Sequence, residues 1–557
     1  MTAAASVRPR AGVRNVVRAA LANGDLRRTG LAFAGFNAAE WAVWIALLVY
    51  AYGQGGAATA SIAAIVQLVP AALFAPFAAQ LADRGSPGRV LLGGYLAQAA
   101  TLAITAAALL AAAPPFAVFA LAGLAASATT ITRPAQAAVV PALVHTLDEL
   151  TSANVVLGWV ESLSVLVAPA VAGALLAVSV PGAVFAVMAA VALSAAVLVA
   201  RVATPADAAP SHDDRRPAAL AELLAGARVV ARDPQSRTLV AVVAVEFVVM
   251  GALDVLFVVL AIDVLALGGS GAGYLNAAFG AGGVLAIAVT VRLVGRARLA
   301  PALGAAALVW ALAMLALGLW QAAGAAFGLL ALAGAGRVAL DVAARTLLQR
   351  SAPAGVLARV FGVLETLDAV GLALGAALAA LLVAALGPGA AIAGLGALAL
   401  VLLAAAGRRL REVDAGADVP LVEIALLRLH PFFSALSPPA LERLARELSP
   451  LQATAGESVI REGEPGERYL LVADGRLQVS RAGVPIASVG RGDGVGEVSL
   501  LARVPCTATV TALTDARLYA IRPETFVDIV AGHPATAGVA ARLVRERLSQ
   551  RQPSAST

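Results

Sequence analysis

Residues 31–52 read LAFAGFNAAEWAVWIALLVYAY, an apolar run interrupted by Asn37 and Glu40. A helix rises 1.5 Å per residue, so about 20 apolar residues cross the hydrocarbon core of a bilayer. About twelve runs of this length occur, at roughly 31–52, 57–80, 90–112, 115–138, 155–178, 181–200, 238–262, 271–294, 300–319, 322–344, 360–384 and 387–406. The predicted fold class is an all-α polytopic membrane protein with twelve transmembrane helices, followed by a soluble α+β domain.

The composition supports this prediction and excludes several kinds of chemistry. Of the 557 residues, 60% are hydrophobic and 13% are charged, which is about half of the charged share of a soluble protein. The chain contains no lysine, so it has no Walker A loop, no kinase lysine and no pyridoxal Schiff base. Four scattered histidines and the single Cys506 have no zinc-binding spacing. We therefore expect no enzyme, no metal and no catalytic cofactor.

Arginine is distributed unevenly between the connections. The segments 52–56, 114–115, 181–182 and 387–389 carry no charge, whereas the alternate connections and residues 1–28 are rich in arginine. By the positive-inside rule the arginine-bearing side is cytoplasmic. Residues 1–28 contain no apolar core and do not form a signal peptide. The chain is thus predicted to be a multi-pass protein of the cell (plasma) membrane, with both termini in the cytoplasm.

The spans fall into two related halves. A polar cytoplasmic central loop, 201–237, separates six runs at 29–200 from six at 238–407. RPAQAAVVP at 133–141 and RTLLQRSAP at 345–353 occupy corresponding positions, and GWVESL at 158–163 corresponds to GVLETL at 362–367. A repeat of this kind is typical of two-repeat transporters.

Three carboxylates fall within the spans. Glu40 lies near the middle of the first span, and Glu246 lies at a comparable depth of the seventh, with Asp254 in the same run. A carboxyl group in the membrane is costly and usually faces a polar cavity, where it can carry a proton. The alternative, of about equal weight, is a neutral carboxyl bonded to a neighbouring helix. Asp263 is expected at the outer surface.

Charged residues near the cytoplasmic ends suggest charge clamps between helices. Arg337, Asp341 and Arg345 share one helical face, and Glu365 and Asp368 lie on the next span. In the first half we expect Asp83, Arg133 and Glu161 to form the equivalent clamp, next to Arg84, and Arg345 and Glu365 to form its repeat partner. Structural clamps are favoured over direct contact with a substrate.

The loop AQLADRGSPGR at 79–89 resembles the signature of the major facilitator superfamily, with Ala79 in place of the leading glycine. Residues 164–173, SVLVAPAVAG, are similar to the antiporter motif of that superfamily, and ITRPAQAAVVPALV at 131–144 adds to the likeness. The resemblance covers about 25–411 and is strongest to drug or siderophore exporters. It implies twelve helices around one alternating-access cavity.

After a linker at 408–420, residues 421–551 read as a soluble cytoplasmic domain with the order helix, β-roll, helix. GEPGERYLLVADG at 463–475 and GDGVGEVSLLARVPCTATV at 492–510 resemble the cyclic nucleotide-binding domain. The resemblance implies that backbone amides around Gly496, Glu497 and Val498 cradle a cyclic phosphate, that Glu497 holds the ribose hydroxyl, and that Thr507 lies beside the phosphate. In that family an arginine at the position of Cys506 normally neutralises the phosphate. This chain has cysteine there, so Arg503 is the candidate replacement. The domain either binds cAMP or cGMP weakly or has lost the nucleotide.

The function predicted from the sequence is a secondary active transporter, a proton-coupled exporter of a small molecule, with a cyclic nucleotide-binding-like regulatory domain. The expected partners are the lipid bilayer, a small-molecule substrate and cAMP or cGMP, without nucleic acid. The alternative is a membrane receptor that no longer transports and signals through the cytoplasmic domain.

Overall fold

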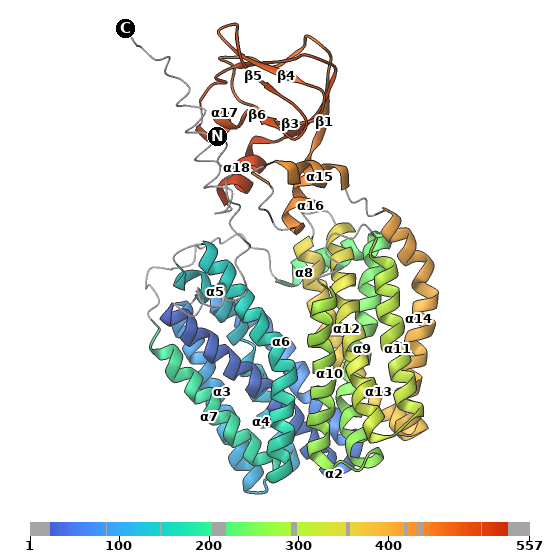
Figure 1. Cartoon of the computed structure of the whole chain (residues 1–557). Helices are drawn as coiled ribbons and strands as arrows, with labels where there is room; N and C mark the ends of the chain where they lie inside the picture. The colour runs from blue at the N-terminus through green and yellow to red at the C-terminus, as the bar shows by residue number, and fades with distance from the viewer. Residues whose placement is uncertain are drawn as a thin grey trace, which may run out of the picture. The chain divides into compact units, whose positions relative to one another are not determined.

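The computed structural model contains two compact units, Met1–Ala417 and Asp418–Thr557. It describes residues 23–84, 86–144, 147–202, 219–290, 298–351, 357–416, 421–430, 432–433, 436, 438–502 and 504–532. Figure 1 shows a helical first unit and a second unit that contains the strands.

The first half of the membrane unit consists of α2 (Gly24–Arg84), α3 (Pro87–Leu110), α4 (Pro115–Thr129), α5 (Thr132–Leu143), α6 (Leu147–Val178) and α7 (Pro181–Ala200). Two predicted spans, 31–52 and 57–80, lie in α2, which is kinked where Gly56 takes a φ of +68°. Only glycine adopts that conformation without strain. One predicted span, 115–138, is divided between α4 and α5.

The second half consists of α8 (Ala219–Arg232), α9 (Pro234–Val259), the π-helical turn η1 (Leu260–Val264), α10 (Gly268–Thr290), α11 (Ala300–Leu319), α12 (Ala323–Ser351), α13 (Leu357–Leu386) and α14 (Pro388–Gly416). Part of the connection 201–237, predicted to be a loop, therefore forms α8, and α14 continues into the predicted linker. Asp233 caps α9 by accepting the backbone N–H of Ser236 at 2.8 Å. Partial burial of Asp233 raises the pKa of its carboxyl group, but the hydrogen bonds from Ser236 and Gln235 outweigh this effect and lower the pKa below its usual value.

The described part of each predicted span is helical, although 115–138 is divided between α4 and α5 and 238–262 continues from α9 into η1. Within the described residues, ten helices are long and apolar enough to cross a membrane. One of them, Gly24–Ala75, contains the first predicted span and most of the second, and α10 provides the remaining predicted span. The all-α membrane fold with six spans in each half follows from this correspondence.

The two halves are joined closely at one end. We call the end of the helices that carries Arg89, Arg201 and Arg359 the arginine end. At the opposite end Tyr52 donates a hydrogen bond to Asp263, which is exposed. There α6 and α10 also pack so closely that a Cβ on Gly273 would lie 2.5 Å from the backbone of Gly173. Toward the arginine end the ribbons of the two halves diverge (Figure 1).

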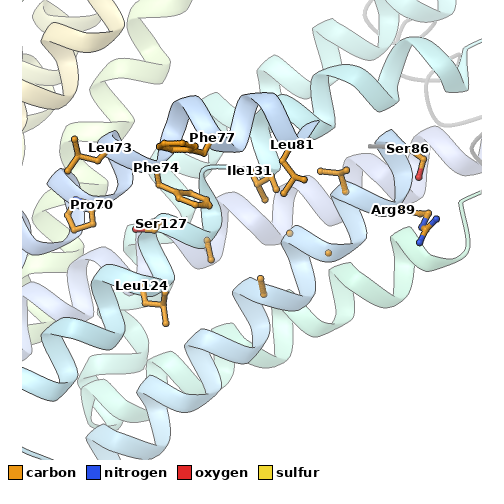
Figure 2. Close-up of a pocket in the computed structure, with 15 residues that line it drawn as sticks. Pro70, Leu73, Phe74, Phe77, Leu81, Ser86, Arg89, Leu124, Ser127 and Ile131 are labelled. Carbon is orange, nitrogen blue, oxygen red and sulfur yellow. The ribbon is translucent and has the colours of Figure 1, made fainter. Parts of the chain in front are cut away.

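Helices α2, α3 and α4 form the walls of an apolar groove with a volume of about 1070 Å³ (Figure 2). Pro70, Leu73 and Leu124 lie at one end of the groove, and Ser86 and Arg89 lie at the other. The groove runs along the first half of the membrane unit.

The second unit begins with two helices and continues as a β-roll. Its elements are α15 (Leu421–Leu429), α16 (Pro438–Glu447), β1 (Ser449–Ala453), β2 (Ser458–Ile460), β3 (Tyr469–Asp474), β4 (Leu477–Arg481), β5 (Val484–Val489), β6 (Gly494–Val495), α17 (Glu497–Ala502), β7 (Thr509–Ala512), β8 (Ala516–Ile521) and α18 (Pro523–Gly532). All pairings are antiparallel, in two four-stranded sheets with the orders β1-β8-β3-β6 and β2-β7-β4-β5. The predicted order of helix, β-roll and helix is confirmed.

Aromatic side chains join the helices of the second unit to its first sheet. Tyr469 on β3 stacks on Phe526 of α18 with ring centroids 4.3 Å apart, and its hydroxyl is 2.8 Å from Nε2 of His430. The backbone N–H of Phe432 donates to Nδ1 of the same histidine. Because Nδ1 accepts a hydrogen bond, neutral His430 carries its proton on Nε2 and donates it to Tyr469.

Candidate functional site: two charged clusters in the membrane unit and a β-roll site

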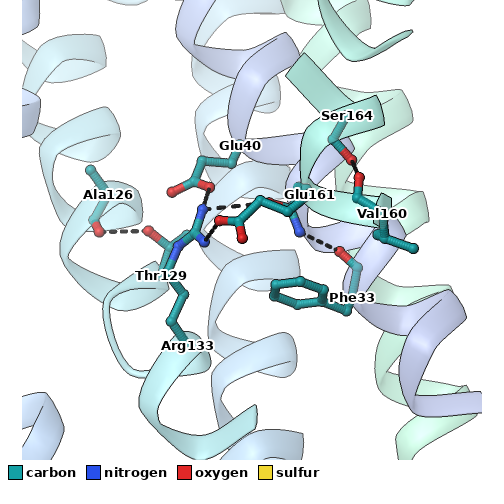
Figure 3. A network of polar contacts seen from close by, with 9 residues as sticks. Phe33, Glu40, Ala126, Thr129, Arg133, Val160, Glu161 and Ser164 are labelled. Atoms are coloured by element: carbon teal, nitrogen blue, oxygen red, sulfur yellow. Dashed lines mark hydrogen bonds and ion pairs between the residues drawn. The ribbon is translucent and has the colours of Figure 1, made fainter. Parts of the chain in front are cut away.

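The first cluster is centred on Arg133, in the first turn of α5 (Figure 3). Its Nη2 is 2.8 Å from Glu40 Oε2 on α2, and its Nη1 is 2.6 Å from Glu161 Oε1 on α6. The guanidinium also lies over the ring of Phe36, 5.5 Å from the centroid. One arginine thus links three helices of the first half by charge-assisted hydrogen bonds.

The side chains of this cluster are partly exposed. The exposed fraction of the side chain is 37% for Glu40, 43% for Arg133 and 53% for Glu161. Ion pairs with this exposure contribute little to stability, because water screens the charges.

The second cluster is built around Glu246 on α9, whose side chain is fully buried. Its Oε1 accepts a hydrogen bond from Nε of Arg337 on α12 at 2.8 Å. The other oxygen, Oε2, is buried and has no hydrogen-bond partner in the described part of the chain. A buried carboxylate with one oxygen unsatisfied costs free energy.

Arg345 forms a second set of contacts further along α12. Its Nε is 2.8 Å from Asp341 Oδ1, one turn earlier on the same helix, and its Nη1 is 3.5 Å from Glu365 Oε1 on α13. Arg337 also interacts electrostatically with Asp341 and with Asp368 on α13. Asp254, which is half-buried, lies about two turns beyond Glu246 on α9. Carboxylates outnumber arginines in this described cluster.

The structure describes the side chains of most of the charged residues that the sequence predicted to form clamps. Arg133 and Glu161 are in contact, and so are Arg345 and Glu365. The side chains of Asp83 and Arg84 lie outside the described residues, so the third member predicted for the first clamp has no structural account. Sequence reasoning missed the pairing of Glu40 with Arg133 and of Glu246 with Arg337. A spacing pattern identifies residues on one helix face, and these partners come from helices distant in the chain.

In the second unit the glycine framework produces a tight turn before α17. Gly496 has a φ of +101°, and a Cβ there would lie 2.8 Å from the carbonyl oxygen of Arg468. Only glycine fits such a position. Glu497 and Val498 follow at the start of α17, and both are buried. The turn thus holds the residues that the resemblance assigns to phosphate and ribose.

Cys506 is buried, and its backbone is held by the loop before β3. Its N–H donates to the carbonyl of Glu464, and its own carbonyl accepts from Gly463, both at 2.8 Å. The carbonyl of Thr507 accepts from Nε of Arg481 at 3.1 Å. Arg481, at the end of β4, therefore places a guanidinium beside the position at which an arginine is missing. Arg503, the replacement expected from the sequence, lies outside the described residues.

A cavity of about 630 Å³ lies close to this turn, between the loop at 463–466, α17 and the start of α18. Its lining includes Gly466, Ser499 and Asp528 but not Glu497, Cys506 or Thr507. The cavity adjoins the predicted nucleotide site, because its lining includes Gly463, which hydrogen-bonds to Cys506, and Pro505, which precedes it.

Known proteins are similar to both parts of the chain. The Major Facilitator Superfamily model matches residues 29–375, and the Cyclic nucleotide-binding domain model matches residues 450–533. Acetyltransferase Pat of Mycolicibacterium smegmatis is 42% identical over 100 residues, which are 17% of this chain and 30% of the relative. The cGMP-dependent protein kinase egl-4 of Caenorhabditis briggsae is 43% identical over 76 residues, 14% of this chain and 10% of the relative.

A third relative is the cAMP-dependent protein kinase regulatory subunit of Emericella nidulans, which is 35% identical over 96 residues, 17% of this chain and 23% of the relative. The chain thus spans less than a third of the length of these curated relatives. The transporter family model, in contrast, covers more than half of the chain. The chain belongs to the Major Facilitator Superfamily and carries a C-terminal cyclic nucleotide-binding domain.

Proposed function

We propose that the membrane unit exports a small molecule in exchange for protons and that the second unit regulates this transport by binding cAMP or cGMP. The observation that carries the proposal is the pair of Glu246 and Arg337, a fully buried carboxylate that binds one arginine and leaves one oxygen without a described partner. A proton added to that oxygen removes the charge that holds Arg337.

Loss of the Glu246 charge changes the balance of attraction on Arg337. Arg337 already interacts electrostatically with Asp341 and Asp368, and also with Asp254. Once Glu246 is neutral, Asp341 on α12 and Asp368 on α13 draw the guanidinium away from Glu246. An ion pair that changes partner with protonation is a two-state element that couples a proton to helix movement.

The direction of transport rests on the family resemblance and on the position of arginine. The positive-inside rule places the arginine end in the cytoplasm. The motif at 164–173, similar to that of antiporters, lies on α6, and Gly173 packs there against Gly273 of α10. This close contact supports an arrangement that is closed at the end opposite to the arginine end, in which a substrate would enter from the cytoplasmic side.

The proposal for the second unit rests on the turn at Gly496 and on Arg481. The turn and buried Glu497 retain the framework for a cyclic phosphate and a ribose, and Arg481 offers a cation beside Thr507. Since a guanidinium binds phosphate through charge-assisted hydrogen bonds, Arg481 takes the role of the arginine that Cys506 replaces.

Transport in inverted membrane vesicles tests both parts, because their cytoplasmic face is outside. The probes are ethidium, rhodamine 6G and a catechol-based iron chelate, each measured with and without an acidic vesicle interior, and with and without added cAMP or cGMP. We expect a probe to accumulate only when the interior is acidic, and a nucleotide to change its rate. Glu412→Gln, in an exposed ion pair with Arg408, is the control. Equal accumulation of a probe with and without the acidic interior would contradict proton exchange.

A further inference from the structure

The groove between α2, α3 and α4 has the composition of a lipid site rather than of a closed cavity. Its rim carries large apolar side chains, among them Leu73 and Phe77, which are 70% and 65% exposed. Its floor includes small residues, and a Cβ added to Gly93 would meet nothing within 4 Å. The groove is therefore open at the surface and deep enough for a narrow apolar chain.

The length of the groove corresponds to one leaflet of a bilayer. Along α2 it extends from Pro70 to Leu81, a helical rise of about 16 Å. Half of the hydrocarbon core measures about 15 Å. Because Leu81 lies near the end of α2 at Arg84, the groove occupies the leaflet at the arginine end and stops near the middle of the membrane.

Charge is found at one end of the groove only, among its described lining residues. Arg89, in the first turn of α3, is exposed and lies beside Ser86, whereas the far end is formed by Pro70, Leu73 and Leu124 (Figure 2). An arginine at headgroup depth above an apolar channel matches a phosphate attached to an acyl chain. A guanidinium binds phosphate by paired, charge-assisted hydrogen bonds.

We propose that this groove binds one anionic phospholipid of the leaflet at the arginine end, with an acyl chain along Gly93 and Phe77 and the phosphate on Arg89. The bound lipid fills the space between α2 and α4, so that these helices move together with α3. The occupant is a membrane component and differs from the transported molecule.

A photo-crosslinking amino acid at Leu124, which lines the inner end of the groove and is 58% exposed, tests the proposal in the full chain. The protein is reconstituted in a bilayer of equal parts phosphatidylglycerol and phosphatidylcholine, illuminated and analysed by intact mass. We expect mainly a phosphatidylglycerol adduct, reduced several-fold by Arg89→Gln and lost in Gly93→Leu. A Cβ at Gly93 meets nothing within 4 Å, so Gly93→Leu adds its side chain to the groove without a clash at the helix backbone.

Two control variants separate the site from general effects. Arg201→Gln removes another exposed arginine at the same end, and Gly304→Leu adds the same volume on α11, where a Cβ meets nothing within 4 Å. Both should keep the adduct. The proposal is overturned by equal adducts of the two lipids, by an adduct that Arg89→Gln leaves unchanged, or by cross-linking to a second copy of the chain.

Discussion

Arg133 and Arg337 each bind the central carboxylate of their own half, yet they do not occupy equivalent positions in the repeat. The repeat places Arg133 opposite Arg345, and Arg337 lies eight residues earlier, where the first half has Ala125. Glu40 therefore shares its arginine with Glu161, whereas Glu246 has an arginine separate from the one that binds Glu365. The duplicated halves have diverged, because the central carboxylate Glu40 is partly exposed whereas its counterpart Glu246 is buried.

We expect Glu246→Gln to insert and fold normally and to abolish transport driven by the pH gradient. The amide keeps the size of the side chain and can still accept from Arg337, but it cannot take up a proton. Initial rates of probe uptake in inverted vesicles, at matched protein levels, measure this effect. A variant that still responds fully to the pH gradient would remove Glu246 from the coupling mechanism.

A pair of substitutions separates the structural role of Glu246 from its transport role. Glu246→Leu removes the carboxylate that accepts a hydrogen bond from Arg337 and should lower stability by about 1.5–3 kcal/mol, the contribution of a hydrogen bond to a charged group. The double variant Glu246→Leu with Arg337→Leu should recover most of this loss but remain inactive in transport. Thermal unfolding in detergent gives the stabilities, and recovery of transport by the double variant would show that the pair is only structural.

Arg133→Gln should change the conformation of the transporter far more than its stability. The pairs with Glu40 and Glu161 are partly exposed, so their loss should cost about 1 kcal/mol or less. We expect a broader distance distribution between spin labels at Val155 and Gln349, attached in a Cys506→Ser background. Arg345→Gln is the matched variant of the second half. If both variants give the same distance distribution as the parent protein, these arginines do not act as charge clamps.

Gly273→Ala should disfavour the arrangement in which the end opposite to the arginine end is closed. The added Cβ would lie 2.5 Å from the backbone of Gly173 and 2.6 Å from the carbonyl oxygen of Pro169, so α6 and α10 must separate. Overpacking of this kind costs about 1–3 kcal/mol. Solvent access to a cysteine placed at Tyr274 should rise, while Gly304→Ala, with no neighbour within 4 Å, should leave it unchanged.

Cys506→Arg should strengthen the binding of cAMP or cGMP to the full chain by about 1.5–3 kcal/mol, the contribution of a hydrogen bond to a charged group. Arg481→Gln should weaken binding by a similar amount if Arg481 provides the phosphate contact. Calorimetry on the purified protein measures both, with Arg476→Gln, in the loop between β3 and β4, as the control. Absence of binding in the parent and in Cys506→Arg would favour a purely structural second unit.

The sequence alone determined which segments cross the membrane, where the chain changes to a soluble domain, and that the membrane part is duplicated. These features are local, because a spanning helix satisfies its own backbone hydrogen bonds and needs only a continuous apolar run. The kink at Gly56 and the helix α8 within the central connection were not predicted.

Tertiary structure alone decided which charges meet. Glu40 and Arg133 lie 93 positions apart and Glu246 and Arg337 lie 91 positions apart, so helical spacing says nothing about either pair. The approach of Arg481 to Thr507 and the groove beside Arg89 likewise depend on how separate elements pack. Local patterns define elements through their own backbone and apolar faces, whereas the partner of a long charged side chain is chosen by the packing of whole helices and strands.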